Sequence, residues 1–407
     1  MAEQHEKALV PQIRFTGFTD PWEQRKLGDV ARRVTRKNEN RDSDLPLTIS
    51  AQYGLVDQRT FFNNQVASKD MSGYFLLHKG EFAYNKSTST DSPWGAIKRL
   101  EKYDMGCVST LYICFELLSG DPDFLVTYYE TDRWYKAVQL IAAEGARNHG
   151  LLNIAPDDFF ETQICIPKRI DEQRQIGAFF DRLDSLITLH QRKYDKLCVL
   201  KKSMLDKMFP KGGSLYPEIR FAGFTDPWEQ RKLGELFEES DERASDREIL
   251  SVSVANGIYP ASESDRETNP GASLANYKVV HSGDVVYNSM RMWQGAVDAS
   301  RYDGIVSPAY VVAKPNSEVY ARFFARLLRQ PMLLKQYQQV SQGNSKDTQV
   351  LKFDDFASIE ISMPASENEQ RQIGAFFDRL DSLITLHQRK LELLRNIKKS
   401  MLDKMFV

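Results

Sequence analysis

Polar and aromatic side chains gather in two parts of this chain, between short apolar runs. Arginine and lysine donate hydrogen bonds to guanine edges, asparagine and glutamine pair with adenine, and serine or lysine hold phosphates. These residue types favour contacts with DNA, although solvated loops of many unrelated proteins have the same composition. The candidates are Asn85, Lys86, Ser87, Trp94, Arg147, Asn148 and His149 in the first part, and Asn288, Arg291, Trp293, Gln294, Asn344 and Lys346 in the second.

Catalytic signatures are missing from the sequence. It contains no GxxxxGK[ST], GxGxxG, HExxH or GxSxG motif, and no Pro-Pro pair of the kind that base methyltransferases carry in [NDS]PP[YF]. The four cysteines form no CxxC pair, and no histidines stand near them at metal-ligand spacing. The sequence therefore predicts a non-catalytic chain without a metal site or a cofactor of its own.

Length and composition bound the class of protein. The 407 residues suggest two or three domains, and the 42% hydrophobic and 27% charged residues suit ordinary globular cores. The net charge of -2 does not decide on nucleic acid, because phosphate binding depends on local basic surface. No apolar run reaches the roughly 18 residues of a membrane span, and the start lacks a signal-peptide pattern. We expect a cytoplasmic protein without membrane contact.

Two segments of the chain recur in its second half. The segment Gln12–Asp29 returns as Glu218–Glu235 with three of 18 residues changed, and Glu172–Lys193 returns unchanged as Glu369–Lys390. The residues between them differ, apart from faint echoes such as GEFAYNK from Gly80 beside GDVVYNS later. The chain is thus two copies of a variable block followed by a constant block, and we expect one fold for both variable blocks.

Each constant block reads as one long helix. Apolar residues alternate at spacings of three and four, the pattern of a heptad seam, and Ser366 with Glu369 forms a candidate capping box before the second helix. About 38 residues from Glu172 to Phe209 would extend roughly 57 Å, enough for a spacer. The predicted seam residues are Ile176, Phe179, Leu183, Leu186, Leu197, Leu200 and Met204, and Ile373, Phe376, Leu380, Leu383, Leu394, Ile397 and Met401.

The variable blocks open on a repeated element and continue as β-rich runs. Asp20 as a cap and Gly28 as a stop predict a short helix in PWEQRKLG. Runs such as YFLLHKGEFAY, LYICFELL, YKVVHSGDVVY and AYVVAKP, bounded by Gly, Pro or Asp, predict strands. Each variable block is therefore expected to be a mixed α/β domain. Phe15, Phe18 and Trp22 are the expected packing anchors of the opening element.

Two dissimilar blocks, each followed by the same long helix beginning P-x-x-x-x-EQ-x-x-I, strongly resemble the specificity subunits of Type I restriction-modification systems. The FTDPWEQRKLG opening is similar to the variety common in Gram-positive bacteria, and the likeness runs from about Gln12 to the C-terminus. The resemblance implies that each block is a target-recognition domain for one half of a split site in double-stranded DNA. It also implies that an antiparallel helix pair sets the gap between the halves.

The same resemblance implies partners that perform the chemistry. Two modification subunits would use S-adenosylmethionine to methylate adenine, and restriction subunits would use ATP and Mg²⁺ to translocate and cleave DNA. No cofactor would belong to this chain. Recognition domains of the family diverge so widely that no base-contacting residue carries over, so the DNA candidates rest on residue chemistry alone.

The expected architecture is α+β: two target-recognition domains in a pseudo-twofold arrangement, joined by two long antiparallel helices that form a coiled coil. The expected divisions are an N-terminal tail at 1–11, recognition domains at 12–167 and 218–364, spacer helices at 168–209 and 365–407, and a linker at 210–217.

Three other interpretations remain open at this point. The repeat could reflect gene duplication without functional symmetry. The helices alone would also suit a scaffold that joins two protein-binding domains, for which DNA affinity would lack a steep salt dependence. The scattered polar residues leave room for an enzyme of unrecognised chemistry, which activity of the isolated chain would reveal.

Overall fold

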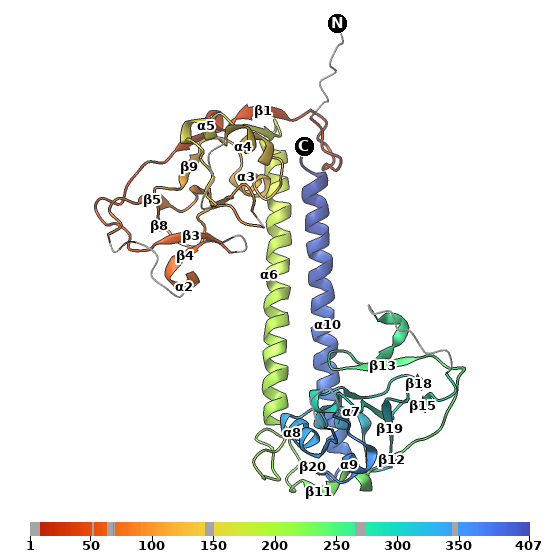
Figure 1. Cartoon of the computed structure of the whole chain (residues 1–407). Helices are drawn as coiled ribbons and strands as arrows, with labels where there is room; N and C mark the ends of the chain where they lie inside the picture. The colour runs from red at the N-terminus through yellow and green to blue at the C-terminus, as the bar shows by residue number, and fades with distance from the viewer. Residues whose placement is uncertain are drawn as a thin grey trace. The chain divides into compact units, whose positions relative to one another are not determined.

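The structure is a computed structural model that describes residues 9–50, 53–62, 68, 70–90, 92–142, 150–264, 274–343 and 349–407. The chain forms two compact units. Unit 1 comprises Met1–His190 with Lys390–Val407, and unit 2 comprises Gln191–Arg389. Each unit therefore contains one variable block, the beginning of the long helix that follows it, and the end of the other long helix (Figure 1).

A four-stranded antiparallel sheet lies in each unit, and both sheets have the same strand order. Because the strands correspond one by one, the prediction that both variable blocks share one fold is confirmed. The echoing runs GEFAYNK and GDVVYNS hold the central strands β6 and β16. In sheet order, unit 1 has β2 (Ala31–Arg33), β9 (Ile113–Leu117), β6 (Phe82–Asn85) and β7 (Ala96–Arg99), and unit 2 has β12 (Phe237–Glu239), β19 (Tyr310–Pro315), β16 (Val285–Asn288) and β17 (Val297–Ala299).

Smaller antiparallel pairs and short helices complete each unit, again in matching order. In unit 1 these are β3 (Leu47–Ser50) with β4 (Gly54–Asp57), β5 (Phe75–His78) with β8 (Met105–Val108), and helices α2 (Gln58–Phe62), α3 (Pro122–Tyr128), α4 (Tyr135–Ile141) and α5 (Pro156–Phe160). In unit 2 they are β13 (Leu250–Ser253) with β14 (Gly257–Pro260), β15 (Lys278–Val280) with β18 (Gly304–Val306), and α7 (Ala321–Leu327), α8 (Pro331–Val340) and α9 (Phe353–Ala357), with the 3-10 turns η2 (Ala261–Glu263) and η3 (Met292–Gln294).

The repeated opening element corrects one sequence-based prediction. Instead of a short helix beginning at Pro21, the chain forms strand β1 (Glu23–Lys26), which pairs antiparallel with β10 (Gln163–Ile166) before the one-turn helix α1 (Leu27–Val30). The partner strand supplies backbone hydrogen bonds that outweigh the local helix signal. Unit 2 repeats this with β11 (Glu229–Lys232), β20 (Glu360–Met363) and η1 (Leu233–Glu235).

The anchoring role of the tryptophan in this element is confirmed. Trp22 is 3% exposed and packs edge-on against Phe124 and Phe406 in the core of unit 1. Trp228 packs in the same way against Phe209 and Phe323 in unit 2. Phe15 and Phe18 are only partly buried, against Phe179 and beneath the Arg169 guanidinium respectively.

Both predicted long helices are present, as α6 (Ile170–Lys207) and α10 (Glu367–Lys404), each of 38 residues. The first turns of each helix are buried in its own unit. The core of unit 1 takes Ile176 and Leu183 from α6 and borders Leu394, Ile397 and Met401 of α10. The core of unit 2 takes Ile373 and Leu380 from α10 and borders Leu197 and Met204 of α6. In each unit, the beginning of one helix and the end of the other thus share a core.

The rest of the predicted seam departs from a uniform buried stripe. Leu186 and Leu200 are 38% and 40% exposed, and Leu383 is half-buried. Phe180 and Phe377 are almost completely buried, whereas the predicted Phe179 and Phe376 are only partly so. The heptad pattern accounts for one face of each helix, but the first turns are embedded in a domain, which buries a second face as well.

Candidate nucleic-acid interface

The described DNA candidates of unit 1 lie on the hairpin between β6 and β7. Asn85 ends β6, and its Oδ1 accepts a hydrogen bond of 3.0 Å from the backbone N–H of Ser87. At the other side of the hairpin, the Tyr84 hydroxyl donates to the Trp94 carbonyl at 2.7 Å. Gly95 closes the turn with φ +79°, and a Cβ there would collide with the Asn85 carbonyl, so this turn requires glycine.

The candidates of unit 2 lie on the corresponding hairpin between β16 and β17. Asn288 ends β16 and accepts 3.0 Å from the N–H of Met290, the same turn that Asn85 makes. The Arg291 guanidinium donates to Gln294 Oε1 at 3.2 Å, and the Trp293 indole donates to the Met290 carbonyl at 3.2 Å. Four candidates that were chosen by residue type therefore share one turn.

The two hairpins also have the same neighbour. In unit 1 the N–H of Leu152 donates to the Lys86 carbonyl at 3.0 Å, and in unit 2 the N–H of Leu351 donates to the Ser289 carbonyl at 2.9 Å. These neighbours follow two stretches that held further candidates. Those candidates, Arg147, Asn148, His149, Asn344 and Lys346, lie outside the described residues.

The hairpin side chains differ in what they offer to a ligand. Lys86 is half-buried, and burial lowers its pKa. Its ammonium donates to the Ile154 carbonyl at 3.2 Å, so this side chain is bonded to the protein's own backbone. Arg291 is exposed, and one nitrogen of its guanidinium donates to Gln294 Oε1. A guanidinium can donate two hydrogen bonds to a guanine edge, and a side-chain amide can pair with an adenine edge. Ser87 is exposed, whereas Asn85, Trp94, Asn288, Trp293 and Gln294 are half-buried.

Sequence reasoning missed a buried ion pair that occurs once in each unit. Arg14 donates to the two oxygens of Glu172 at 2.6 and 2.7 Å, and the Trp22 indole donates to the same carboxylate at 3.2 Å. In unit 2, Arg220 donates to Glu369 at 2.6 and 2.8 Å. Both carboxylates are 1% exposed. The predicted capping-box role of Glu369 is wrong, because its carboxylate is occupied by Arg220 and the Trp228 indole.

The buried Arg–Glu pair and its tryptophan form a clamp between each domain and its helix. The glutamine that follows the glutamate in each helix extends this clamp. The Gln173 side chain accepts 2.9 Å from the N–H of Asp121 and donates 2.8 Å to the Pro167 carbonyl. Gln370 accepts 2.9 Å from the N–H of Tyr320 and donates to the Glu318 and Pro364 carbonyls. The Glu-Gln dipeptides thus tie each helix start to its domain. The signal was in the sequence, since both the arginine and the dipeptide lie in repeated segments.

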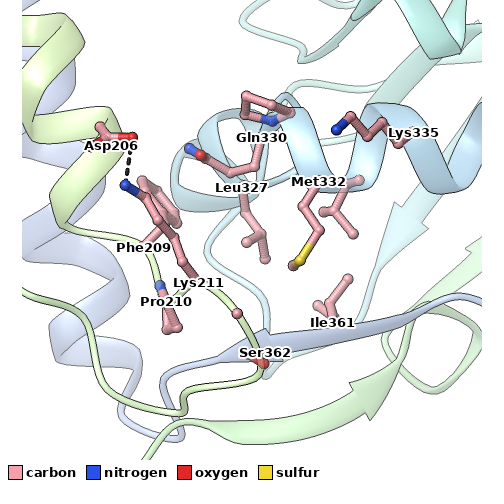
Figure 2. A pocket seen from close by; sticks show the side chains of 13 residues that line it. Asp206, Phe209, Pro210, Lys211, Leu327, Gln330, Met332, Lys335, Ile361 and Ser362 are labelled. Carbon is pink, nitrogen blue, oxygen red and sulfur yellow. Dashed lines mark ion pairs between the residues drawn. The ribbon is translucent and has the colours of Figure 1, made fainter.

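A cavity of about 350 Å³ lies in unit 2 (Figure 2). Leu327, Met332 and Ile361 line it, and the Asp206–Lys211 ion pair lies at its edge. Leu327 is the last residue of α7, and the last residue of the matching helix α3 is Tyr128. The Tyr128 ring is buried, and its hydroxyl has a hydrogen bond with the backbone of Cys165. Cys165 lies on β10, which corresponds to β20, the strand that holds Ile361 and Ser362.

Other kinds of site are not formed by the part of the chain that the structure describes. Within it, no group of three or more His, Cys, Asp or Glu side chains is arranged to hold a metal ion. Of the helices described there, none is long and apolar enough to cross a membrane.

Comparison with known proteins agrees with this geometry. Residues 225–396 match the family model described as Type I restriction modification DNA specificity domain. The fold is similar to that of the S subunit of the Type I restriction-modification system from M. genitalium, with 16% identity, a TM-score of 0.58, and coverage of 98% of this chain and 99% of that one. The HsdS subunit from Thermoanaerobacter tengcongensis matches at 17% identity over 95% and 96% of the two chains, with a TM-score of 0.43.

Residues 225–396 are thus similar to the DNA specificity domain of Type I restriction-modification systems, and unit 1 has the same strand order as unit 2. The match supports a DNA sequence-specificity subunit of such a system, a kind of protein that directs catalysis by other subunits. The resemblance that the sequence predicted is confirmed.

Proposed function

We propose that each unit reads one half of a bipartite DNA site, and that the complex directs adenine methylation or restriction by other subunits to that site. The observation that carries this proposal is the pair of matching hairpins. Their strands occupy corresponding places in two sheets of the same strand order, but the side chains differ: Asn85 to Trp94 in one hairpin, Asn288 to Gln294 in the other. Equal scaffolds with unequal hairpins suit two different half-sites.

The proposal gives the helices a separate task. We infer an antiparallel coiled coil of α6 and α10 between two recognition domains in a pseudo-twofold arrangement, which fixes the gap between half-sites. Leu189 and Leu386 are the same residue of the repeat, and they are 46% and 45% exposed. Because each helix presents the same repeated residues, the pair suits two copies of one protein partner, the modification subunits.

The chemistry in this proposal belongs to the partners. The modification subunits bind S-adenosylmethionine, and the restriction subunits use ATP and Mg²⁺. Because the substrate is cellular double-stranded DNA, the complex acts in the cytoplasm. The predicted division into two recognition domains, two spacer helices and a linker forms part of the same proposal.

Selection from a random-site duplex library tests the proposed function, using the chain assembled with its modification subunits. We expect enrichment of a two-part site with a fixed gap, and affinity that falls steeply with salt. Equal retention of all sequences would contradict the proposal. Protein binding without salt-sensitive DNA affinity would favour the scaffold interpretation instead.

Insertion of seven residues into both α6 and α10 tests the role of the helices. One heptad preserves the seam and adds about 10 Å, so the gap should lengthen while both half-sites stay unchanged. Altered half-sites would contradict a separate coding of gap and sequence.

A further inference from the structure

The two long helices present the same charged residues to two different domains. In unit 1, Lys398 of α10 forms an ion pair of 2.6 Å with Asp184 of α6. In unit 2, Lys201 of α6 forms one of 2.5 Å with Asp381 of α10. Lys201 and Lys398 are one position of the repeat, and Asp184 and Asp381 are another. The helix side of both docking surfaces is therefore chemically identical at this pair.

The domain of unit 1 meets this pair with an acid. Glu130 lies two residues after α3, and its carboxylate contacts Lys398 at 2.7 Å and Lys98 at 3.4 Å. The side chains of Lys398 and Glu130 are only 17% and 21% exposed, whereas Asp184 is 46% exposed. The lysine of the helix pair thus carries the contact with the domain.

The domain of unit 2 contacts the same pair through basic side chains. Arg326 of α7 is 13% exposed and contacts Asp381 at 2.7 Å and Asp378 at 2.9 Å. Arg301 also approaches Asp378, at 3.3 Å. The residue two positions after α7, where unit 1 has Glu130, is Arg329. In this unit the aspartates of the helix carry the contact with the domain.

We propose that the repeated Asp–Lys pair is a docking site of dual charge, which seats an acidic domain through its lysine and a basic domain through its aspartates. A partly buried charge needs an opposite charge beside it, and the pair offers one of each sign. The helix residue that the domain does not use keeps its partner on the other helix. Domains of either polarity therefore fit either helix, and the charge of the domain is the variable half of the contact.

Matched substitutions in the two units test this by hydrogen exchange of the full-length chain. Lys398→Met should speed exchange in residues 122–141 about tenfold or more, because it leaves Asp184 unpaired and Glu130 with Lys98 alone. Lys201→Met should change exchange in residues 321–340 less than about threefold, because Arg326 still pairs with Asp381. Equal effects of the two lysine substitutions would overturn the proposal.

The aspartates should show the reverse order. Asp378→Asn should speed exchange in residues 321–340 about tenfold, since three arginines surround that carboxylate. Asp181→Asn, at the same position of the other copy, changes an exposed side chain and should leave residues 122–141 within about twofold. Aspartate effects of equal size would likewise overturn it.

Charge inversion of unit 1 is the decisive arm. Glu130→Arg with Lys98→Asp copies Arg329 and Asp298 of unit 2, and Asp298 follows the β17 residue that matches Ile97. The domain should stay folded, and its sensitivity should move from Lys398→Met to Asp184→Asn. Sensitivity that stays with Lys398, or loss of protection throughout the domain, would overturn the proposal.

This docking proposal rests on the proposed function only in treating the two variable blocks as recognition domains, and the experiment needs no DNA. If hydrogen exchange follows the predicted pattern but the complex selects no sequence from the library, only the proposed function is refuted. A selective library with the wrong exchange pattern would refute the dual-charge docking site alone.

Discussion

Unit 1 and unit 2 share strand order, hairpin position and helix register, and they differ in the parts that would touch a ligand. The repeated residues are those that hold the domain on the helix, namely Arg14, Glu172 and Gln173 with their copies Arg220, Glu369 and Gln370. The hairpins, the charges with which each domain contacts the helix pair, and the packing beside α3 and α7 are not repeated. The comparison indicates that attachment is constant while recognition varies.

The buried clamp should show the largest and the most equal effects. Arg14→Met leaves the Glu172 carboxylate buried without its cation, which should lower the stability of unit 1 by about 3–5 kcal/mol. Arg220→Met should do the same to unit 2. Hydrogen exchange of each unit in urea measures both effects, and Arg14→Lys is the control that keeps the charge but loses the two-pronged geometry. Clearly unequal losses would break the comparison at the place where the units are most alike.

The hairpin of unit 2 should show a smaller, one-sided effect on DNA. Arg291→Ala should lower affinity for the selected site by about 1–3 kcal/mol and relax base preference in one half-site only. Binding titrations with single-base variants of the site measure this, using the chain with its modification subunits.

The control for this experiment is Arg291→Lys, which keeps the positive charge but not the fork. It should retain nonspecific affinity and lose base preference. Relaxed preference in both half-sites would contradict separate reading by the two units.

The cavity of unit 2 should give the smallest effect. Leu327→Tyr introduces the ring that Tyr128 supplies in unit 1, and filling the cavity should stabilise unit 2 by about 1 kcal/mol. Thermal unfolding measures the change, and Tyr128→Leu in unit 1 is the reverse control, with an expected loss of about 2–3 kcal/mol. Destabilisation by Leu327→Tyr would show that the matching helices do not place their last residues alike.

Local patterns predicted the parts of this fold that local sequence decides. Both long helices and the strands of YFLLHKGEFAY and AYVVAKP were predicted, because periodicity and flanking glycines are local signals. The opening helix was wrong because Glu23–Lys26 pairs with Gln163–Ile166, and such a distant partner leaves no mark in the local pattern.

For the candidate site, too, local residue chemistry predicted one part, and contacts between distant segments decided the rest. Residue chemistry placed Asn85 and Asn288 on loops, and the structure shows that they end the corresponding strands β6 and β16 of the two sheets. It did not reveal that Lys86 is engaged by Ile154, nor that Glu369 pairs with Arg220 rather than capping its own helix. These contacts join segments far apart in the chain, so they follow from tertiary packing and not from spacing.

Replacement of residues 80–154 by the matching segment of another protein tests the division between constant attachment and variable recognition most directly. The donor segment should come from a family member with a known, different site, and the methylated sequences should be mapped in cells that carry the chimera with its modification subunits. The account predicts that one half of the methylated site changes to the donor's sequence, while the other half and the gap stay the same. A change in both halves, or in the gap, would contradict it.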